Sequence, residues 1–239
     1  NLVNQMIKCR NCKSKKLRKI ITVGSQPLSG VFYKNKKFNL KKYSLDLFKC
    51  QICSLIQLSK TPNSYQMFGR TYEYRTSLSN LMTFHIKNKI KNLKKKNLIR
   101  HDSSVLDIGS NDGTFLNNLS KSMQLFGIDP SVKKFRYLYK KNINVINNFF
   151  SKKNIENFLQ KEIGKKIQFD LITSFAMFYD VNDPNSFCDD IYKLLKKNGI
   201  WILELSYFPL MLKNLTYDQI CHEHVTYYTL AVFKKIIEK

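Results

Sequence analysis

The chain has 239 residues, enough for one large domain or for a medium-sized domain with a small additional one. Its hydrophobic content of 43% supplies a packed core, and no run approaches the roughly 18 apolar residues of a membrane span. The net charge of +24 comes from lysines scattered among Asn and Ile, a pattern that favours solvated faces over a nucleic-acid or membrane surface. No secretory leader is evident, so we expect a cytoplasmic protein.

Two CxxC pairs stand near the start of the chain: Cys9 with Cys12, and Cys50 with Cys53. Two such knuckles complete a tetrahedral four-thiolate site, whereas a redox dithiol needs one pair only and disulfides are rare in a reducing compartment. The spacing therefore predicts a structural zinc. Residues 1–60, with a further strand in the alternating segment 38–49, are expected to form a small β-rich domain that depends on the metal.

Residues 61–100 are expected to form a linker followed by an amphipathic helix. The linker segment 61–79 holds four aromatic residues, which either pack between domains or line a substrate pocket: Tyr65, Phe68, Tyr72 and Tyr74. Ser77 or Ser79 can cap the helix. His85 falls on the apolar stripe of that helix, which favours a packing histidine over a functional one.

From residue 101 onward strands and helices alternate, which predicts a parallel, doubly wound α/β sheet. The expected strands are 104–108, 124–128, 144–147, 169–174 and 200–205. The expected helices are about 113–122, 131–141, 153–162 and 185–197. Ligands of such folds bind at the carboxyl ends of the strands, where the strand order reverses.

A glycine turn follows the first of these strands, in the segment SSVLDIGSNDGTF at 103–115. Gly109 and Gly113 allow a sharp turn and a close approach to a ligand, so we interpret the turn as the cradle of a nucleotide-type cofactor. Its spacing differs from the dinucleotide fingerprint GxGxxG. A plain connection between a strand and a helix is the alternative.

Polar and aromatic residues at the ends of the later strands fit the same cofactor. Asp129 follows Asp107 by 22 residues and can accept hydrogen bonds from both hydroxyls of a ribose. Asn148 and Phe149 could hydrogen-bond and stack on an adenine, and Ser174 would lie beside the cofactor.

The segment 203–230 contains His222, Glu223 and His224 in succession, with several tyrosines nearby. Two histidines at i and i+2 could bind a metal, but no third ligand is evident. A histidine with a neighbouring carboxylate can also serve as a general base near neutral pH. We favour the base.

The motifs DIGSNDG, IDP and LITSFAMF together resemble class I S-adenosylmethionine-dependent methyltransferases, whose Rossmann-like parallel sheet we therefore expect. A dinucleotide oxidoreductase is the main competitor. By the resemblance, Asp129 holds the ribose of the cofactor. The residues around its methionine part would be Asp107, Gly109, Ser110, Asn111 and Gly113.

The cysteine knuckles, YEYRTSLS, MFYDVNDP and YDQICHEH narrow the resemblance to the zinc-containing sugar C-methyltransferases. Those enzymes methylate a nucleotide-linked deoxy-keto-sugar next to its ketone. The resemblance implies zinc on the four cysteines and active-site roles for Tyr72, Glu223 and His224, with His224 as the base that forms the enolate. We expect the zinc to be remote from this chemistry and to serve folding only.

In that family a helix, two strands and a C-terminal domain follow, whereas this chain ends at Lys239, so we expect a truncated core over 101–239. The expected partner is a small nucleotide-sugar substrate, with no nucleic acid and no membrane. Two rivals remain: a methyltransferase for RNA or another small molecule, and a truncated protein that binds the cofactor without turnover.

Overall fold

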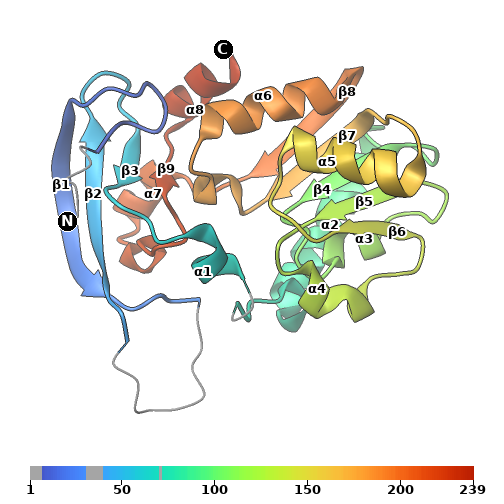
Figure 1. Ribbon diagram of the computed structural model, residues 1–239, viewed down its shortest axis with the longest axis horizontal. Coiled ribbons are helices and arrows are strands. Elements are labelled where there is room, and N and C mark those ends of the chain that lie inside the picture. Colours follow the sequence, from blue (N-terminus) through green and yellow to red (C-terminus); the bar gives the residue numbers. More distant parts are fainter. Residues whose placement is uncertain (1–6, 31–39, 70–71) are drawn as a thin grey trace. The chain divides into compact units, whose positions relative to one another are not determined.

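The computed structural model describes residues 7–30, 40–69 and 72–239 (Figure 1). The chain forms two compact units. Unit 1 consists of Asn1–Glu73, Ala176–Cys188 and Leu205–Lys239, and unit 2 of Tyr74–Phe175 and Asp189–Glu204. The expected boundaries near residues 60 and 100 are therefore replaced by an arrangement in which the chain returns twice to its N-terminal unit. Within the described ranges, no helix has both the length and the apolar character needed to cross a membrane.

Unit 1 is built on an antiparallel sheet in the order β1-β2-β3-β9. Its strands are β1 (Leu17–Gln26), β2 (Tyr43–Cys50), β3 (Ile56–Leu58) and β9 (Thr226–Tyr227). β2 confirms the strand expected within 38–49, of which residues 38 and 39 lie outside the described residues. β9, red in Figure 1, lies beside β3 although most of the chain separates the two in sequence.

Short helices complete unit 1. They are α1 (Ser64–Phe68), the 3-10 turns η4 (Phe178–Asp180) and η5 (Tyr217–Gln219), α7 (Phe208–Lys213) and α8 (Leu230–Ile237). The apolar side chains of the sheet and of α7 form one core. Its buried members are Leu45, Leu47, Ile56, Leu58, Phe208, Met211, Ile220 and Tyr227.

Unit 2 contains the expected parallel sheet, in the order β6-β5-β4-β7-β8. The strands are β4 (Ser104–Ile108), β5 (Gln124–Ile128), β6 (Ile143–Ile146), β7 (Phe169–Phe175) and β8 (Leu195–Glu204). The strand order reverses between β4 and β7, so the carboxyl ends of these two strands mark the place where such folds bind ligands.

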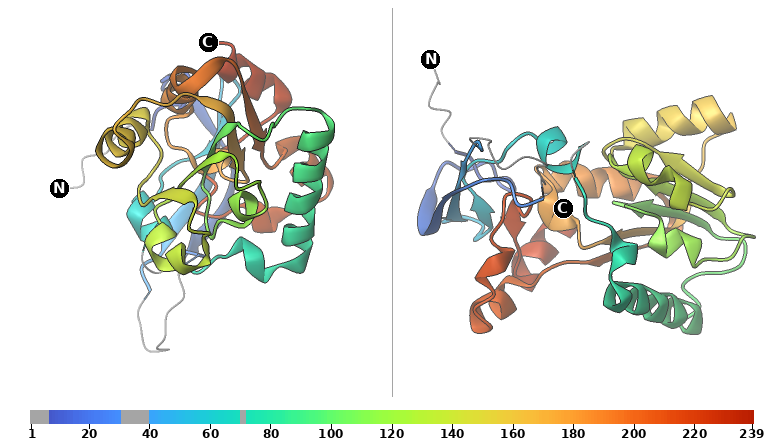
Figure 2. Two further views of the ribbon diagram at one scale, coloured as in Figure 1. Left: turned by 90° about the vertical axis from the view of Figure 1, so that its right-hand side faces the viewer. Right: turned by 90° about the horizontal axis from the view of Figure 1, so that it is seen from below.

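Helices cover both faces of this sheet (Figure 2). On one face, α2 (Asn80–Lys95) and α3 (Thr114–Asn117) bury Ile86, Ile90 and Phe115 against β4 and β5. On the other face lies α5 (Lys152–Phe158), which continues into η3 (Leu159–Ile163). Ser79 caps α2 as expected, because its side chain accepts a hydrogen bond from Met82 N at 3.2 Å.

The remaining helices are shorter than their sequence periodicity indicates. The segment 131–141 divides into α4 (Val132–Phe135) and η2 (Arg136–Leu138), and α3 ends where Asn118 Nδ2 donates back to Thr114 O at 2.7 Å. α6 (Pro184–Leu194) ends three residues before the expected helix end at residue 197, because β8 begins at Leu195. There a Cβ on Gly199 would lie 2.7 Å from Phe169 O, so only glycine allows this close approach of the two strands.

Candidate functional site

The four knuckle cysteines come together at one end of the unit 1 sheet. Cys9 and Cys12 precede β1, and Cys50 and Cys53 lie at the turn after β2, because β1 and β2 pair with Leu17 opposite Cys50. All four sulfur atoms lie within 4.8 Å of one another, with 3.4 Å between Cys9 and Cys53 and 3.5 Å between Cys12 and Cys50.

This geometry fits zinc. Tetrahedral Zn–S bonds of about 2.3 Å require sulfur atoms about 3.8 Å apart, close to the observed separations. No disulfide joins the four thiols. Each knuckle turns through a left-handed residue directly after its second cysteine, Lys13 (φ 59°) and Ser54 (φ 64°), so that the two halves of the site have the same backbone form.

The zinc module shares its sheet with the segment that carries the histidines. Ile56 of β3 pairs with Tyr227 of β9, and Leu58 N donates to Val225 O at 3.0 Å. Val225 directly follows His224. The strand next to the second knuckle therefore pairs with the strand that His224 leads into, and the expectation that the zinc is remote from the chemistry stays a prediction.

His224 has the tautomer that a general base requires. Its Nδ1 lies 2.9 Å from the carbonyl oxygen of Gln219, which can only accept, so the proton sits on Nδ1 and the lone pair on Nε2. Burial lowers the pKa of His224, which keeps the ring neutral near pH 7. The ring of Tyr179 packs against it, with 4.2 Å between the ring centroids.

Glu223 and Tyr72 meet at a turn near the end of the described N-terminal segment. The carboxylate of Glu223 is buried and accepts from Ser29 Oγ at 2.7 Å and from Gly30 N at 2.8 Å. A Cβ on Gly30 would lie 2.7 Å from Glu223 Oε1 and 3.2 Å from the Tyr72 ring. Two of the three predicted catalytic residues thus enclose Gly30, and Glu223 binds this turn.

His222 does not share a metal with His224. Its ring is buried, and its Nε2 donates to Tyr43 O at 3.1 Å. In the part of the chain that the structure describes, the cysteines form the only cluster of three or more potential metal ligands. The geometry therefore favours the base over the metal-binding alternative.

Asp180 is a residue of this site that sequence reasoning missed, although the motif MFYDVNDP contains it. It ends η4, directly after Tyr179, and its Oδ1 is shielded from solvent. Among the described residues, none makes a hydrogen bond to its Oδ1. Burial, with the negative charge of Glu223 as a second cause, raises the pKa of Asp180 well above its usual range, which favours the protonated carboxyl group, a hydrogen-bond donor.

The glycine turn of unit 2 follows β4 at the reversal of the strand order. Gly109 takes a positive φ of 71°, and its N–H donates to Ile128 O at 2.9 Å. Asp107 is buried on β4, where Oδ1 accepts from Thr173 Oγ1 of β7 at 2.6 Å. Burial, reinforced by the charge of Asp129, raises the pKa of Asp107 to about 7.

Tyr139, which was not among the residues predicted from the sequence, contacts this turn through its hydroxyl group and its ring. Its hydroxyl lies 2.9 Å from Ser110 Oγ and donates to Asn111 O at 2.8 Å. Gly113 has φ 77°, and a Cβ there would lie 2.7 Å from the Tyr139 ring. Gly113 therefore makes room for the Tyr139 ring, while the expected close approach to a ligand stays a prediction.

Asn111 and its neighbour Asp112 bind the segment before α2. Asn111 Oδ1 accepts from Thr76 N at 3.0 Å, and its Nδ2 donates to Tyr74 O at 3.0 Å. Asp112 Oδ2 accepts from Ser77 N at 2.8 Å. The side chain of Asn111 therefore holds this segment onto the turn, while its backbone N–H and C=O bind Asp129 and Tyr139.

Asp129, which the sequence predicts to hold the ribose of the cofactor, follows β5 at its carboxyl end. Its Oδ2 accepts from Asn111 N at 3.1 Å and its Oδ1 from Ser131 N at 2.7 Å, and burial raises its pKa. Ser131 Oγ also donates to Oδ1, so Oδ2 is the carboxylate oxygen that can accept a further hydrogen bond. The turn and Asp129 thus fit an adenosine-type cofactor, with a buried acceptor beside a glycine turn.

Two other predicted cofactor residues differ in their placement. Asn148 and Phe149 follow β6 at the same edge of the sheet, and Asn148 Oδ1 accepts from Phe149 N at 2.9 Å. Ser174 Oγ instead accepts from the Trp201 indole at 2.8 Å and is fully buried between β7 and β8. The prediction that the Ser174 side chain binds the cofactor is therefore not supported.

His85 is a partner of Glu204 rather than a packing residue on the apolar face of α2. Its Nε2 lies 3.0 Å from Glu204 Oε2 at the carboxyl end of β8, and Lys89 pairs with the same carboxylate. This cluster is partly exposed.

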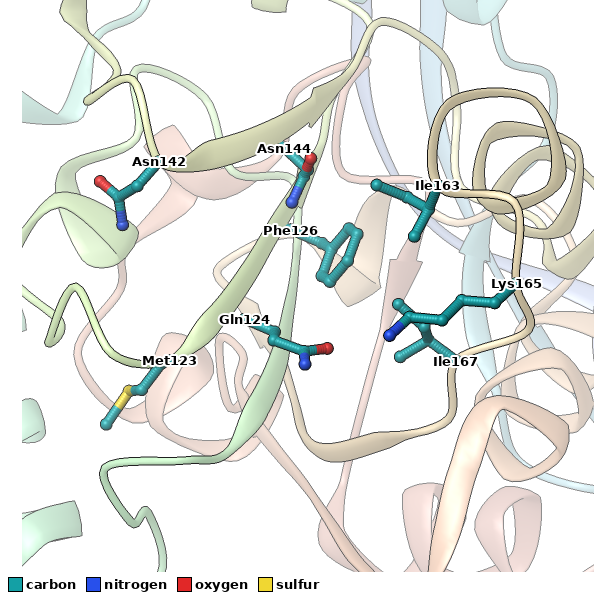
Figure 3. Close-up of a pocket in the computed structure, with 8 residues that line it drawn as sticks. All are labelled: Met123, Gln124, Phe126, Asn142, Asn144, Ile163, Lys165 and Ile167. Atoms are coloured by element: carbon teal, nitrogen blue, oxygen red, sulfur yellow. The ribbon is translucent and has the colours of Figure 1, made fainter.

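A hollow of about 260 Å³ opens at the opposite, amino edge of the unit 2 sheet (Figure 3). Its lining residues are Met123, Gln124, Phe126, Asn142, Asn144, Ile163, Lys165 and Ile167. Because α/β sheets bind ligands at their carboxyl edge, this hollow is separate from the cofactor site.

Comparisons with known proteins agree with this architecture. A family described as "Methyltransferase domain" matches residues 78–239, and one described as "Putative zinc binding domain" matches residues 9–68. The C-methyltransferase NovU of Streptomyces niveus is 22% identical over 246 residues, which cover 100% of this chain and 56% of NovU. The tRNA U34 carboxymethyltransferase of Sulfurimonas denitrificans is 32% identical over 120 residues, 48% of this chain and 39% of that protein.

The chain thus spans about half the length, or less, of the curated relatives it matches. Among solved structures, the plantazolicin methyltransferase BpumL, in complex with a pentazolic desmethylPZN analog and SAH, aligns with a TM-score of 0.50 at 17% identity. The alignment covers 66% of this chain and 63% of BpumL, and it supports the fold alone.

The predicted class I fold and the predicted cofactors, S-adenosylmethionine and zinc, are confirmed by these matches together with the cysteine cluster. Since the first family match covers more than half of the chain, this protein belongs to the methyltransferase domain family, and its N-terminal part matches a putative zinc-binding domain.

Proposed function

We propose that this protein methylates the carbon next to the ketone of a nucleotide-linked keto-deoxysugar, with His224 as the general base. The observation that carries the proposal is the hydrogen bond between His224 Nδ1 and Gln219 O, which directs the lone pair to Nε2. The similarity to a curated C-methyltransferase over the whole chain supports carbon as the acceptor. The motif resemblance to sugar C-methyltransferases supports the substrate class.

His224 Nε2 removes the proton next to the ketone and leaves an enolate. Its lowered pKa keeps the base neutral at pH 7, and a positioned base contributes roughly 10²- to 10⁴-fold in rate. The Tyr179 ring, which packs on the imidazole, restricts its orientation. In-line transfer then requires the enolate carbon and the methyl donor to meet in near-attack geometry.

The enolate oxygen needs hydrogen-bond donors. We assign this role to the Tyr72 hydroxyl, with the neutral carboxyl group of Asp180 as a second donor. Glu223 accepts hydrogen bonds from Ser29 and Gly30 and serves to position that turn next to Tyr72.

S-adenosylmethionine, when bound, supplies an electrophilic methyl group. We assign its ribose to Asp129, its adenine to Asn148 and Phe149, and its methionine part to the backbone of residues 109–113. The buried position of Asp129, with its two backbone donors already in place, fixes the carboxylate for this contact.

Hydrogen–deuterium exchange in ²H₂O tests the base separately from methyl transfer. The full-length protein, incubated with a nucleoside diphosphate keto-deoxysugar and S-adenosylhomocysteine, should exchange the proton next to the ketone. The His224→Asn variant should lose this exchange, whereas variant His101→Asn, which changes an exposed histidine, should retain it. Normal exchange in His224→Asn would remove His224 from the role of base.

An RNA methyltransferase is the second candidate, favoured by the net charge of +24 and by the similarity to a tRNA-modifying enzyme over half of the chain. It predicts tight RNA binding that weakens steeply between 50 and 200 mM salt. Methyl transfer to tRNA but not to the keto-sugar would favour this candidate over the first.

A further inference from the structure

We propose that Gln57 is a positioning residue that couples the first zinc knuckle to His224. This inference rests on the proposed role of His224 as the base. According to this proposal, the zinc site not only stabilises the fold but also sets the orientation of the His224 imidazole.

Gln57 binds the knuckle on both sides of Cys9. Its Oε1 accepts from Arg10 N at 2.7 Å, and its Nε2 donates to Lys8 O at 3.0 Å. The side chain is 1% exposed. A buried amide whose donor and acceptor are both paired holds its partners in one arrangement, because breaking either bond leaves a buried polar group unsatisfied.

The backbone of Gln57 lies in β3, directly opposite Thr226 of β9. Thr226 is fully buried, and its Oγ1 donates to Tyr179 O at 3.1 Å, while Val225 N donates to the same oxygen at 2.9 Å. The ring of Tyr179 in turn packs on His224. A continuous chain of buried contacts therefore runs from Cys9 through Gln57 and Thr226 to the imidazole.

A second set of contacts joins the same knuckle to the loop that follows Tyr179. Arg10 Nη1 donates to Asn182 Oδ1 at 2.8 Å, and Asn185 Nδ2 donates to Asn11 O at 2.8 Å. A displacement of the knuckle would therefore reach Tyr179 by two routes, through β9 and through the loop that follows Tyr179. The side chain of Gln57 makes two hydrogen bonds to the knuckle, so its replacement should have the largest effect.

The test uses the NMR signal of the His224 ring in the full-length, zinc-loaded protein without substrate. The Tyr179 ring, 4.2 Å away, shifts this signal by its ring current. In Gln57→Leu, which keeps the volume but breaks both bonds, the shift should decrease while zinc remains bound stoichiometrically. Gln51→Leu makes the same change at an exposed position of the second knuckle and should leave the signal in place.

A second variant tests the connection if Gln57→Leu fails to fold. Thr226→Val keeps the shape of β9, removes the bond to Tyr179 O and should also reduce the ring-current shift. In both variants we expect kcat to fall about tenfold with the cofactor affinity unchanged, since small misplacement of a reacting group costs rate rather than binding. An unshifted His224 signal in the folded variants would overturn the inference. Absence of transfer to keto-sugars would instead contradict the proposed function and leave the NMR comparison intact.

Discussion

The imidazole of His224 donates its Nδ1 proton to the carbonyl oxygen of Gln219, five residues earlier in the chain. The same oxygen accepts from the Tyr227 hydroxyl at 3.3 Å. A carbonyl oxygen can only accept hydrogen bonds, so Nδ1 of His224 must carry the proton. Gln219, in the turn η5, therefore fixes the histidine in a single tautomer. This local arrangement depends on the backbone of residues 219–227 and needs no charged partner for the ring.

The pH dependence of catalysis should report this environment. Because burial lowers the pKa of His224 below the ordinary histidine value of about 6.5, the base loses its proton before rising pH reaches that value. We therefore expect kcat/KM to rise with pH, to level off before pH 7 and to stay level to pH 8. Variant Tyr179→Leu, which removes the packed ring and admits water, should move the midpoint of the rise toward pH 6.5. A midpoint above 6.5 in the parent enzyme would contradict the assignment.

Much of unit 2 could be predicted from the sequence because its signals are local. The apolar run Val105 to Ile108 and the glycines after it lie next to one another in the chain and define β4 and its turn. The role of Gly113 could not be predicted in the same way, since it depends on Tyr139, which a distant segment places under the turn.

The organisation of unit 1 depends on pairing over long sequence distances. The strand β9 has only two residues and no periodicity to detect, yet it joins the zinc module to the histidine segment. Gln57 and Asp180 owe their importance to burial against partners from other parts of the chain, which neither residue type nor spacing reveals. The cysteine knuckles were predictable because metal-ligand spacing is itself a local signal.

Loss of one of the four zinc-binding cysteines should destabilise unit 1 more than loss of a cysteine outside the zinc site. Variant Cys50→Ser removes a buried ligand at the end of β2 and should abolish stoichiometric zinc binding and lower the Tm. Variant Cys188→Ser changes a thiol outside the cluster and should bind zinc normally. Metal analysis and thermal denaturation measure both effects. Full zinc occupancy in Cys50→Ser would argue against the four-cysteine site.

A comparison of Gly24 with Gly113, which have nearly the same φ, separates the steric cost of an added Cβ from the conformational cost of a positive φ. Gly24 has φ 79° and open space where a Cβ would lie, whereas a Cβ on Gly113 (φ 77°) would meet the Tyr139 ring at 2.7 Å. Gly24→Ala should cost about 1 kcal/mol, the ordinary penalty of the left-handed region. Gly113→Ala should cost about 1–3 kcal/mol more through overpacking and should weaken cofactor binding.

Urea denaturation of both variants measures the difference. The double variant Gly113→Ala/Tyr139→Leu should lose part of the steric cost, because the ring that the new methyl group meets is gone. Equal costs for the two single variants would show that Tyr139 does not determine the need for Gly113.

Ionisation of Asp107 should make the stability of the protein depend on pH. Burial and the charge of Asp129 raise its pKa to about 7 from an ordinary 3.8, so the folded state binds a proton that the unfolded state has lost between these values. The stability contributed by the protonated group is complete below pH 4 and decreases as pH rises through 7. Variant Asp107→Asn cannot ionise but keeps an acceptor for Thr173 Oγ1.

The Tm of Asp107→Asn relative to that of the parent should therefore increase from pH 4 to pH 8, by the equivalent of at most about 4 kcal/mol, since each tenfold change in an ionisation constant is worth about 1.4 kcal/mol. Variant Thr173→Val should have the opposite effect, because it removes the hydrogen bond that stabilises the ionised carboxylate. Thermal denaturation across this pH range distinguishes the two. A constant difference in Tm between Asp107→Asn and the parent would mean that Asp107 titrates alike in the folded and unfolded protein.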